Sequence, residues 1–264
     1  MKPDGRTAII LVNYNGHVDT ISCLMSLLRL DSSDFDVFVV DNASPDGGGD
    51  EIFNWGNEQE GFNFSYVDYR DDLNLERLHA EAVGMRESSS PRCVLVRSSR
   101  NGGFAYGNNV GIKVAERFYA YEYYWILNND TEVELDSLSQ MISTMSSKSD
   151  IGAVGSTLRY FNNRDKVQTY GGGVFNKWFA KVTEIKDTAW SGGLDYCTGA
   201  SMLVKRRFVE EVGFMDERYF LYCEELDWAI RGRISGFTIA HANGSVVYHK
   251  EGASIGTDTT NVTN

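Results

Sequence analysis

The chain has 264 residues, 42% of them hydrophobic and 23% charged. Its 25 Lys and Arg against 37 Asp and Glu give a net charge of −12, which argues against nucleic acid or another polyanion as the main partner. The length suits one large α/β domain with a sizeable core. The 4 cysteines lack C-x-x-C spacing, so neither a disulfide framework nor a zinc cluster is indicated, and the reducing cytoplasm is the expected compartment.

The N-terminal part of the sequence predicts a βαβ unit. Residues 7–12 form a continuous apolar run, rich in β-branched side chains, that is typical of a strand buried on both faces. Asp19 can cap a helix whose apolar positions follow the i, i+3, i+4, i+7 pattern. These positions are Ile21, Leu24, Met25 and Leu28. Residues 37–40 form the second strand, and an open sheet of this kind binds ligands beyond the carboxyl ends of its strands.

The rest of the chain alternates predicted strands and helices, the pattern of an α/β domain. Between 61 and 92 the pattern weakens, and we expect an insertion with one extra helix, capped by Asn74 and flanked by loops. Short β-like pieces are expected over 159–190. The other predicted strands cover 94–96, 123–127, 151–154, 197–204 and 246–249, and the other predicted helices cover 51–55, 105–118, 135–145, 207–212 and 225–234. No signal peptide or membrane-spanning run is expected.

Polar residues follow several of the predicted strands. Asp41 ends a buried strand and either projects into a ligand cleft or caps the turn through Ser44. Asp130 follows strand 123–127 and can give oxygen ligands to a divalent cation that holds a diphosphate, although such an Asp is more often a helix cap. His249 becomes a candidate ligand only by pairing with Asp130.

A glycine-rich segment and an acidic cluster add two further candidate sites. Residues 101–109 (NGGFAYGNN) let backbone approach a ligand and open a helix whose N-terminus favours anions. The segment lacks the Lys and Ser/Thr of a phosphate-binding loop, and no G-x-G-x-x-G follows the first strand. Glu224, Glu225 and Asp227 begin a helix, and Asp227 can pair with Arg231 four residues later. Adjacent Glu224 and Glu225 repel each other, which raises a carboxyl pKa and suits a general base.

In this order along the chain, the motifs resemble those of family 2 glycosyltransferases, specifically the bacterial rhamnosyltransferase-like branch. The resemblance spans nearly the whole chain, and its strength lies in the order of seven motifs that are individually weak. They are VNYNG (12–16), VDNAS (40–44), NGGFA (101–105), LNND (127–130), TGA (198–200), EELD (224–227) and HKEGAS (249–254).

The resemblance implies an α/β GT-A fold, with a mixed, mostly parallel sheet, in a single domain over 1–264. The nucleotide-binding half would cover 1–130 and the acceptor-binding half 131–255. The activity implied is inverting transfer from a nucleotide-diphosphate sugar, with Mg²⁺ or Mn²⁺ as cofactor. The residues implied at the donor are Asn13, Tyr14, Asp41, Asn101, Gly102, Gly103, Asn108, Asn129 and Asp130. Gly199 and Ala200 would lie at the transferred sugar and acceptor, Asp130 and His249 at the metal, and Glu225, Glu224 and Asp227 at the catalytic position.

Two positions depart from the family pattern. Asn128 stands where the Asp-x-Asp metal motif has its first acid, so ligation would rest on Asp130 and His249. Glu225 stands where many relatives have Asp, which leaves both Glu224 and Glu225 open as the base.

The resemblance also suggests the partners. The donor would be a dTDP- or UDP-sugar, with rhamnose as one candidate, and the acceptor a hydroxyl of a glycan or lipid-linked chain in cell-surface polysaccharide synthesis. Peripheral contact with the inner membrane face would follow. One alternative is a sugar-nucleotide pyrophosphorylase, which would be expected to have a basic, Gly-rich loop after the first strand in place of NYNG (13–16). The other is a catalytically silent carbohydrate-binding protein, which would be expected to have lost Asp130 or the glutamate pair.

Overall fold

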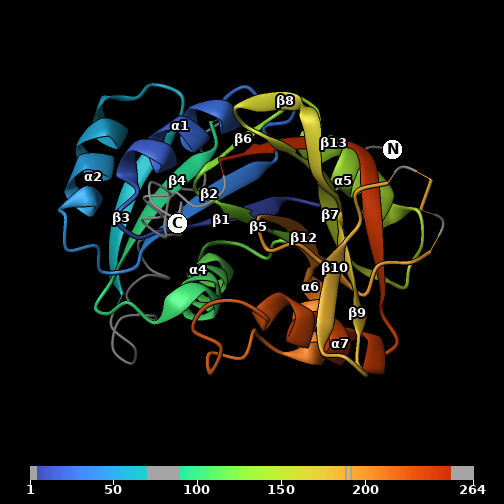
Figure 1. Cartoon of the computed structure of the whole chain (residues 1–264). Coiled ribbons are helices and arrows are strands. Elements are labelled where there is room, and N and C mark those ends of the chain that lie inside the picture. The colour runs from blue at the N-terminus through green and yellow to red at the C-terminus, as the bar shows by residue number, and fades with distance from the viewer. Residues whose placement is uncertain (1–4, 70–89, 188, 191, 251–264) are drawn as a thin grey trace, which may run out of the picture.

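The structure, a computed structural model, describes residues 5–69, 90–187, 189–190 and 192–250. Within these residues, ten strands form the central sheet in the order β3-β4-β2-β1-β5-β12-β7-β13-β6, with β8 beside β7 (Figure 1). The strands are β1 (Thr7–Asn13), β2 (Phe35–Asp41), β3 (Asn63–Tyr69), β4 (Arg92–Ser98), β5 (Tyr123–Asn128), β6 (Thr131–Val133), β7 (Ile151–Tyr160), β8 (Asn163–Tyr170), β12 (Ser201–Lys205) and β13 (Thr238–His249). A smaller sheet, β10-β9-β11, consists of β9 (Gly172–Asn176), β10 (Lys181–Glu184) and β11 (Tyr196–Cys197).

The two halves of the central sheet differ in strand direction. Strands β3, β4, β2, β1 and β5 are all parallel, and their carboxyl ends therefore meet at one edge. β12 runs antiparallel to both β5 and β7, and β13 returns parallel to β7. The apolar runs of β1, β2 and β4 are buried along almost their whole length, as expected for strands covered on both faces. The expected α/β architecture with a mixed sheet is confirmed.

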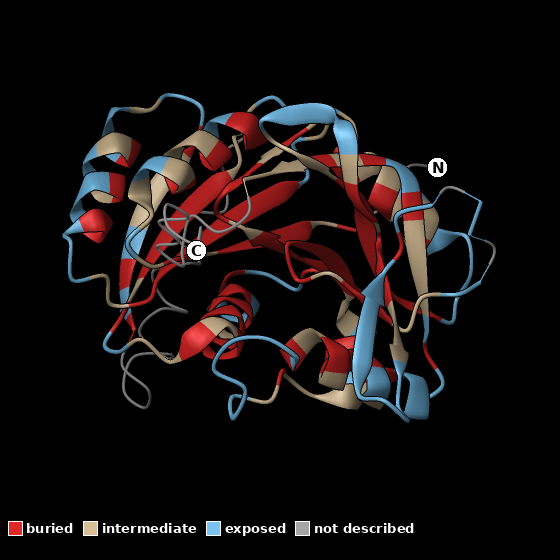
Figure 2. Cartoon of the chain, viewed as in Figure 1, coloured by how far each residue is buried: buried red, intermediate tan, exposed pale blue. Residues whose placement is uncertain are grey.

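Helices cover both faces of this sheet (Figure 2). On one face, α1 (His17–Leu27), α2 (Gly48–Glu58) and α5 (Ser137–Ser146) enclose one apolar cluster. On the other face, α4 (Gly103–Phe118), α6 (Arg206–Val212) and α7 (Glu224–Ile234) enclose a second cluster. No helix in the described part of the chain is both long and apolar enough to cross a membrane.

Two local predictions are wrong, and one short strand was missed. The start of segment 61–92 is not a loop, because residues 63–69 form β3 and pair in parallel with β4 at the sheet edge. Only two residues of β3 are buried, so its sequence lacks the dense apolar run of a central strand. The helix predicted after Asn74 lies outside the described residues. Asp19 is not the helix cap: α1 begins at His17, and Asp19 in its first turn is paired with Lys250. The short strand β6 was not predicted.

Candidate active site

A hydrogen-bonded cluster joins the carboxyl ends of β1 and β2. Asn13 donates from Nδ2 to Asp41 Oδ1 over 2.8 Å and to Ser44 Oγ over 3.1 Å. Ser44 Oγ donates to the same Asp41 oxygen over 2.6 Å. Among the described residues, Asp41 Oδ2 receives only the backbone N–H of Ser44, over 3.4 Å. Asp41 therefore closes the turn, as one of the two interpretations predicted, and still keeps one oxygen with little hydrogen bonding.

The same polar cluster extends to the end of β5 through α1. Thr20 Oγ1 donates to Asn13 Oδ1 over 2.9 Å and receives Nδ2 of Asn129, also over 2.9 Å. Both asparagines are buried, so their side chains are satisfied by protein rather than by water. Thr20, which sequence reasoning missed, thus fixes the relative positions of three strand ends. Its only sequence signal is a polar residue on the buried face of a helix.

The N-terminus of α4 lies between this edge and the approach to α7. Asn42 donates from Nδ2 to Asn101 Oδ1 and to the Gly103 carbonyl oxygen, both over 3.0 Å. Phe104 donates its backbone N–H to the Phe220 carbonyl oxygen over 2.9 Å. Gly103 has φ +85°, and a Cβ there would lie 2.1 Å from that oxygen, so this contact requires glycine. The glycine predicted to approach a ligand therefore also allows two protein segments to meet.

Two asparagines inside α4 have different environments. Asn108, predicted to bind the donor, is buried and donates from Nδ2 to the Phe104 carbonyl oxygen over 2.9 Å. Its buried Oδ1 has no hydrogen-bond partner within the described residues. Asn109, which sequence reasoning passed over, donates to Met215 O over 2.9 Å and accepts from Met215 N over 3.1 Å. Asn109 therefore holds the segment that leads to α7 against α4.

Asp130 and His249, predicted as metal ligands, do meet. His249 Nε2 lies 3.3 Å from Asp130 Oδ1, and both side chains are largely buried. Asn128 Nδ2 is 3.4 Å from the same His249 nitrogen, so the residue in the place of the missing acid also faces this pair. Within the described residues no group of three or more His, Cys, Asp and Glu side chains is arranged to hold a metal. The protein thus offers one carboxylate and one imidazole at this point.

The tautomer of His249 follows from Gln168 on β8. Gln168 donates from Nε2 to the His249 carbonyl oxygen over 3.2 Å, which turns its Oε1 toward His249 Nδ1 at 3.0 Å. Nδ1 must then carry the proton in the neutral ring, and Nε2 is left with a lone pair. That lone pair faces the carboxylate of Asp130, and two acceptors at this distance repel unless a cation or a proton lies between them. This donor set fits a bound divalent cation, with Gln168 orienting the ligand from behind.

The glutamate pair begins α7 after an unusual backbone conformation. Tyr222 and Cys223 both have φ 72°, in the left-handed region that side chains rarely adopt. Glu224 is 4% exposed and Glu225 is half-buried. Each has a buried Oε2 with no hydrogen-bond partner in the described part of the chain. Two unpaired carboxylate oxygens side by side are costly in a protein interior, which marks this helix start as a functional candidate.

The electrostatics separate the three acidic residues of α7. Burial, and then the nearby charge of Glu225, raise the pKa of Glu224 to about 7. Burial also raises the pKa of Glu225. Asp227 instead receives Arg231 Nε over 2.8 Å, the local pairing predicted from the sequence. Asp227 is therefore the least available of the three as a proton acceptor.

The Gly199 and Ala200 turn lies beside the end of β5. Asn128 donates its backbone N–H to the Ala200 carbonyl oxygen over 3.0 Å, and the Gly199 Cα lies against the ring of Phe104, where a Cβ would be 3.3 Å away. The turn is thus placed between the β5 edge and the α4 N-terminus. Tyr196, just before it, has its pKa raised to about 12 by burial and then by the charges of Glu184 and Glu225, and it packs in one apolar cluster with Leu226 and Ala229 of α7. Two predicted residues remain: Tyr14 is half-buried one residue beyond β1, and Gly102 is the residue just before the first residue of α4.

A protein-family model and a curated relative both match this chain. The model is that of Glycosyl transferase family 2, over residues 8–213. The rhamnosyltransferase WbbL of Escherichia coli K12 is 23% identical over 247 residues, which cover 86% of this chain and 77% of WbbL.

Three solved structures share the fold. A mannosyltransferase from Pyrobaculum calidifontis, in complex with GDP-Man and Mn²⁺, matches with TM-score 0.60 and 16% identity over 93% of this chain and 57% of its own. GalNAc-T7, with UDP, GalNAc and Mn²⁺, matches with TM-score 0.65 and 13% identity over 94% of this chain and 44% of its own. S. aureus TarS 1-349 in complex with UDP matches with TM-score 0.59 and 12% identity over 91% of this chain and 60% of its own.

The chain thus spans about half the length of these solved chains, and their likeness carries the fold alone. The family match favours a transferase over the pyrophosphorylase and the silent binding protein. The chain belongs to glycosyl transferase family 2 and is a glycosyltransferase with the GT-A fold.

Proposed function

We propose that the protein is an inverting enzyme that transfers a sugar from a nucleotide-diphosphate donor to a hydroxyl of a glycan or lipid-linked acceptor. The observation that carries this proposal is the position of the α4 N-terminus. Gly103 and Phe104 contact Asn42 at the strand-end cluster and Phe220 on the approach to α7. A donor beyond the strand ends would therefore lie next to a positive helix end and close to the segment that leads to Glu225.

Asp41 is the proposed contact to the nucleotide base. Gly49 lies close to the Asp41 Oδ2, and a Cβ there would be 2.9 Å from that oxygen, so any side chain at this position would cover it. A carboxylate accepts from the imide N–H of uracil or thymine, a group that cytosine lacks. Asn13 and Ser44 donate hydrogen bonds to the other oxygen, Oδ1, and so orient the Asp41 carboxylate. This geometry supports UDP or dTDP over CDP as the donor nucleotide.

Asp130 and His249 are the proposed ligands of a divalent cation. The lone pair on His249 Nε2 and the carboxylate of Asp130 would hold one divalent cation next to the donor diphosphate. When bound, such an ion would neutralise charge that develops on the departing diphosphate. Mn²⁺ accompanies the nucleotide ligands in the mannosyltransferase and GalNAc-T7 structures, which supports the same cofactor class here.

Glu225 is the proposed general base. The next residue, Leu226, packs against Tyr196 just before the Gly199 turn, and the Glu225 residue is more exposed than Glu224, which is 4% exposed. Glu225 would take the proton from the acceptor hydroxyl while that oxygen attacks the anomeric carbon and the diphosphate departs. A single displacement of this kind inverts the configuration at that carbon. Rhamnose as the transferred sugar is supported by WbbL, which is named a rhamnosyltransferase.

The turn between β9 and β10 supports peripheral contact with the inner membrane face. Trp178 and Phe179 at this turn are 83% and 80% exposed, and Lys177 and Lys181 flank them. Exposed aromatic residues between cations are typical of segments that lie in an anionic lipid interface. A Trp178→Ala, Phe179→Ala double variant should lose cosedimentation with phosphatidylglycerol vesicles, and binding equal to the parent would refute this contact.

Nucleotide-dependent stabilisation tests the proposed function directly. UDP or dTDP with Mn²⁺ should raise the melting temperature more than CDP with Mn²⁺, because a ligand that binds only the native state stabilises it. Asp41→Ala should narrow this difference, while Asp46→Ala, an exposed acid in the next turn, should leave it unchanged. A preference for CDP, or no stabilisation by any nucleoside diphosphate, would refute the assignment.

A further inference from the structure

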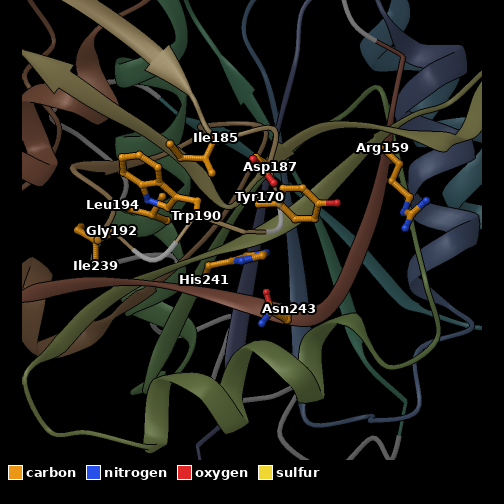
Figure 3. A pocket seen from close by; sticks show the side chains of 11 residues that line it. Arg159, Tyr170, Ile185, Asp187, Trp190, Gly192, Leu194, Ile239, His241 and Asn243 are labelled. Carbon is orange, nitrogen blue, oxygen red and sulfur yellow. The ribbon is translucent and has the colours of Figure 1, made fainter.

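A cavity of about 560 Å³ lies outside the residues assigned so far. Strands β7, β8 and β13 form its floor and one side, and the segment between β10 and β11 forms the other side. Figure 3 shows Trp190 at one end with Ile185 and Leu194, and Tyr170 and His241 near the middle. The volume lies in the range of pockets that hold small organic ligands.

The part of the lining made by Tyr170 and His241 is uncharged and held in place. His241 Nε2 lies 2.8 Å from Thr157 Oγ1, and the rings of His241 and Tyr170 meet edge to face at 5.8 Å. Burial lowers the pKa of His241 to about 4, so the imidazole is neutral at cellular pH. Tyr170 donates its backbone N–H to Ile185 O over 2.7 Å, which fixes the opposite wall against β8. The walls are therefore preformed at these contacts.

The chemistry of the lining fits a sugar ring. Trp190 is 46% exposed, and with Tyr170 it gives aromatic surface whose electron-rich face attracts the weakly positive C–H groups of a pyranose. Asp187 and Asn243 give polar groups for hydroxyls. An anionic ligand fits poorly, because Asp187 is acidic and the guanidinium of Arg159 already donates to the carbonyl oxygens of residues 164 and 165. This lining is typical of a neutral carbohydrate site and not of a nucleotide site.

The cavity is connected to the proposed transfer site through two elements. Leu194 lines the cavity, and two residues later Tyr196 packs against Leu226, the residue after Glu225. Ile239 of β13 also lines the cavity and packs against the cluster of Tyr196, Leu226 and Ala229, the last two from α7. The helix that begins with Glu224 and Glu225 therefore shares a wall with the cavity.

We propose that this cavity binds a sugar unit of the acceptor glycan, adjacent to the unit that receives the transferred sugar. Trp190 and Tyr170 would contact the apolar face of that sugar, and Asp187 and Asn243 its hydroxyls. The assignment rests on the proposed transferase function, which requires a glycan acceptor at α7. It makes the enzyme selective for a glycan of at least two sugar units.

Trp190 gives a direct readout of sugar binding. Five indole N–H signals are expected in a nitrogen-proton correlation spectrum, and Trp190→Phe identifies the one from this cavity. Methyl glycosides of rhamnose, glucose and N-acetylglucosamine serve as probes. At least one should shift the Trp190 signal saturably, with a dissociation constant in the millimolar range. Trp190→Ala should abolish saturation transfer from protein to that glycoside, while Trp178→Ala on the exposed turn should keep it.

The outcomes separate this inference from the proposed function. Stabilisation by UDP or dTDP without a Trp190 shift from any glycoside overturns the sugar cavity and leaves the transferase proposal standing. Glycoside binding at Trp190 without stabilisation by any nucleoside diphosphate supports the sugar cavity and refutes the proposed nucleotide-diphosphate donor. If UDP or dTDP shifts the Trp190 signal as strongly as a glycoside, the cavity belongs to the donor, and the acceptor assignment is wrong.

Discussion

His249 illustrates how single side chains define this site. Its role depends on Gln168, whose Oε1 accepts a hydrogen bond from Nδ1–H and leaves a lone pair on Nε2 opposite Asp130. Gln168 lies 81 residues away in the sequence and carries no motif. A histidine that would be ambiguous by itself becomes a metal-ligand candidate through this hydrogen bond.

Asp130→Ala should abolish the part of nucleotide stabilisation that depends on Mn²⁺. A metal-bound nucleotide at a hundredfold excess over its dissociation constant stabilises by about 2.7 kcal/mol, so the loss is measurable as a melting shift. Glu132→Ala is the matched control, because Glu132 lies two residues after Asp130 and is instead paired with Arg164. Equal Mn²⁺-dependent shifts in Asp130→Ala and the parent would remove Asp130 from the metal site.

Glu225→Gln should lower the transfer rate by roughly 10²-fold or more while donor affinity changes little. The amide keeps the shape of the side chain but cannot accept the acceptor proton. The effect is measured as turnover with a competent acceptor, under conditions where chemistry limits the rate. The control variant Glu224→Gln should lower the transfer rate less than Glu225→Gln. Near-parental turnover in Glu225→Gln would make Glu224 the next candidate for the base.

At the scale of elements, α7 follows a strained stretch of backbone. The left-handed Tyr222 and Cys223 cost of order 1–3 kcal/mol each, and they turn the chain so that the helix starts with two buried glutamates. Trp228 on the same helix is 1% exposed and donates from Nε1 to Gly213 O over 2.8 Å. Packing of the helix thus offsets the strain at its start.

Glu224→Gln should stabilise the protein above pH 7. The folded pKa of Glu224, about 7, lies above its ordinary value of 4.5, so its ionisation is harder in the folded than in the unfolded state. The parent therefore loses stability as the pH rises from about 4.5 through 7, and the full loss is roughly 3 kcal/mol. Urea unfolding of both proteins at pH 5 and pH 8 measures it. If Glu224→Gln raised the free energy of unfolding by the same amount at both pH values, the raised pKa of Glu224 would be contradicted.

At the scale of the whole molecule, the two edges of the parallel sheet have different roles. Asp36, at the amino end of β2, is fully buried and accepts from Arg6 Nη2, Arg92 Nη2 and Tyr121 Oη over 2.8, 2.8 and 2.5 Å. This network joins the chain before β1 to β2 and β4 and to the segment before β5. The opposite edge holds Asp41, whose Oδ2 accepts only one long hydrogen bond from the described residues.

Asp36→Asn should destabilise the fold by about 3–5 kcal/mol, because Arg92 is buried and would lose its counter-charge. Urea unfolding measures this loss. Binding of UDP to the fraction that remains folded should match the parent, since the network lies at the other end of the sheet. A large change in UDP affinity with unchanged stability would show that the two edges are coupled.

Much of the fold followed from continuous apolar runs in the strands and from apolar residues spaced at the 3.6-residue period of a helix. The apolar runs of β1, β2 and β5 and the amphipathic spacing of α4 identified the α/β class, because burial on both faces leaves little choice of residue type. β3 and β6 were missed, since an edge strand is half exposed and a three-residue strand is too short to show a period. The order of the motifs further indicated the glycosyltransferase family.

The sequence by itself determined the fold class, the family and the residue types of the site, because each rests on local spacing. Only the tertiary structure decided how those residues meet. It brought Asp130 to His249, gave Gln168, Thr20 and Asn109 their roles, and opened the cavity beside Trp190. These contacts join positions distant in sequence, and a hydrogen bond or cavity wall of that kind leaves no periodic pattern from which it could be read.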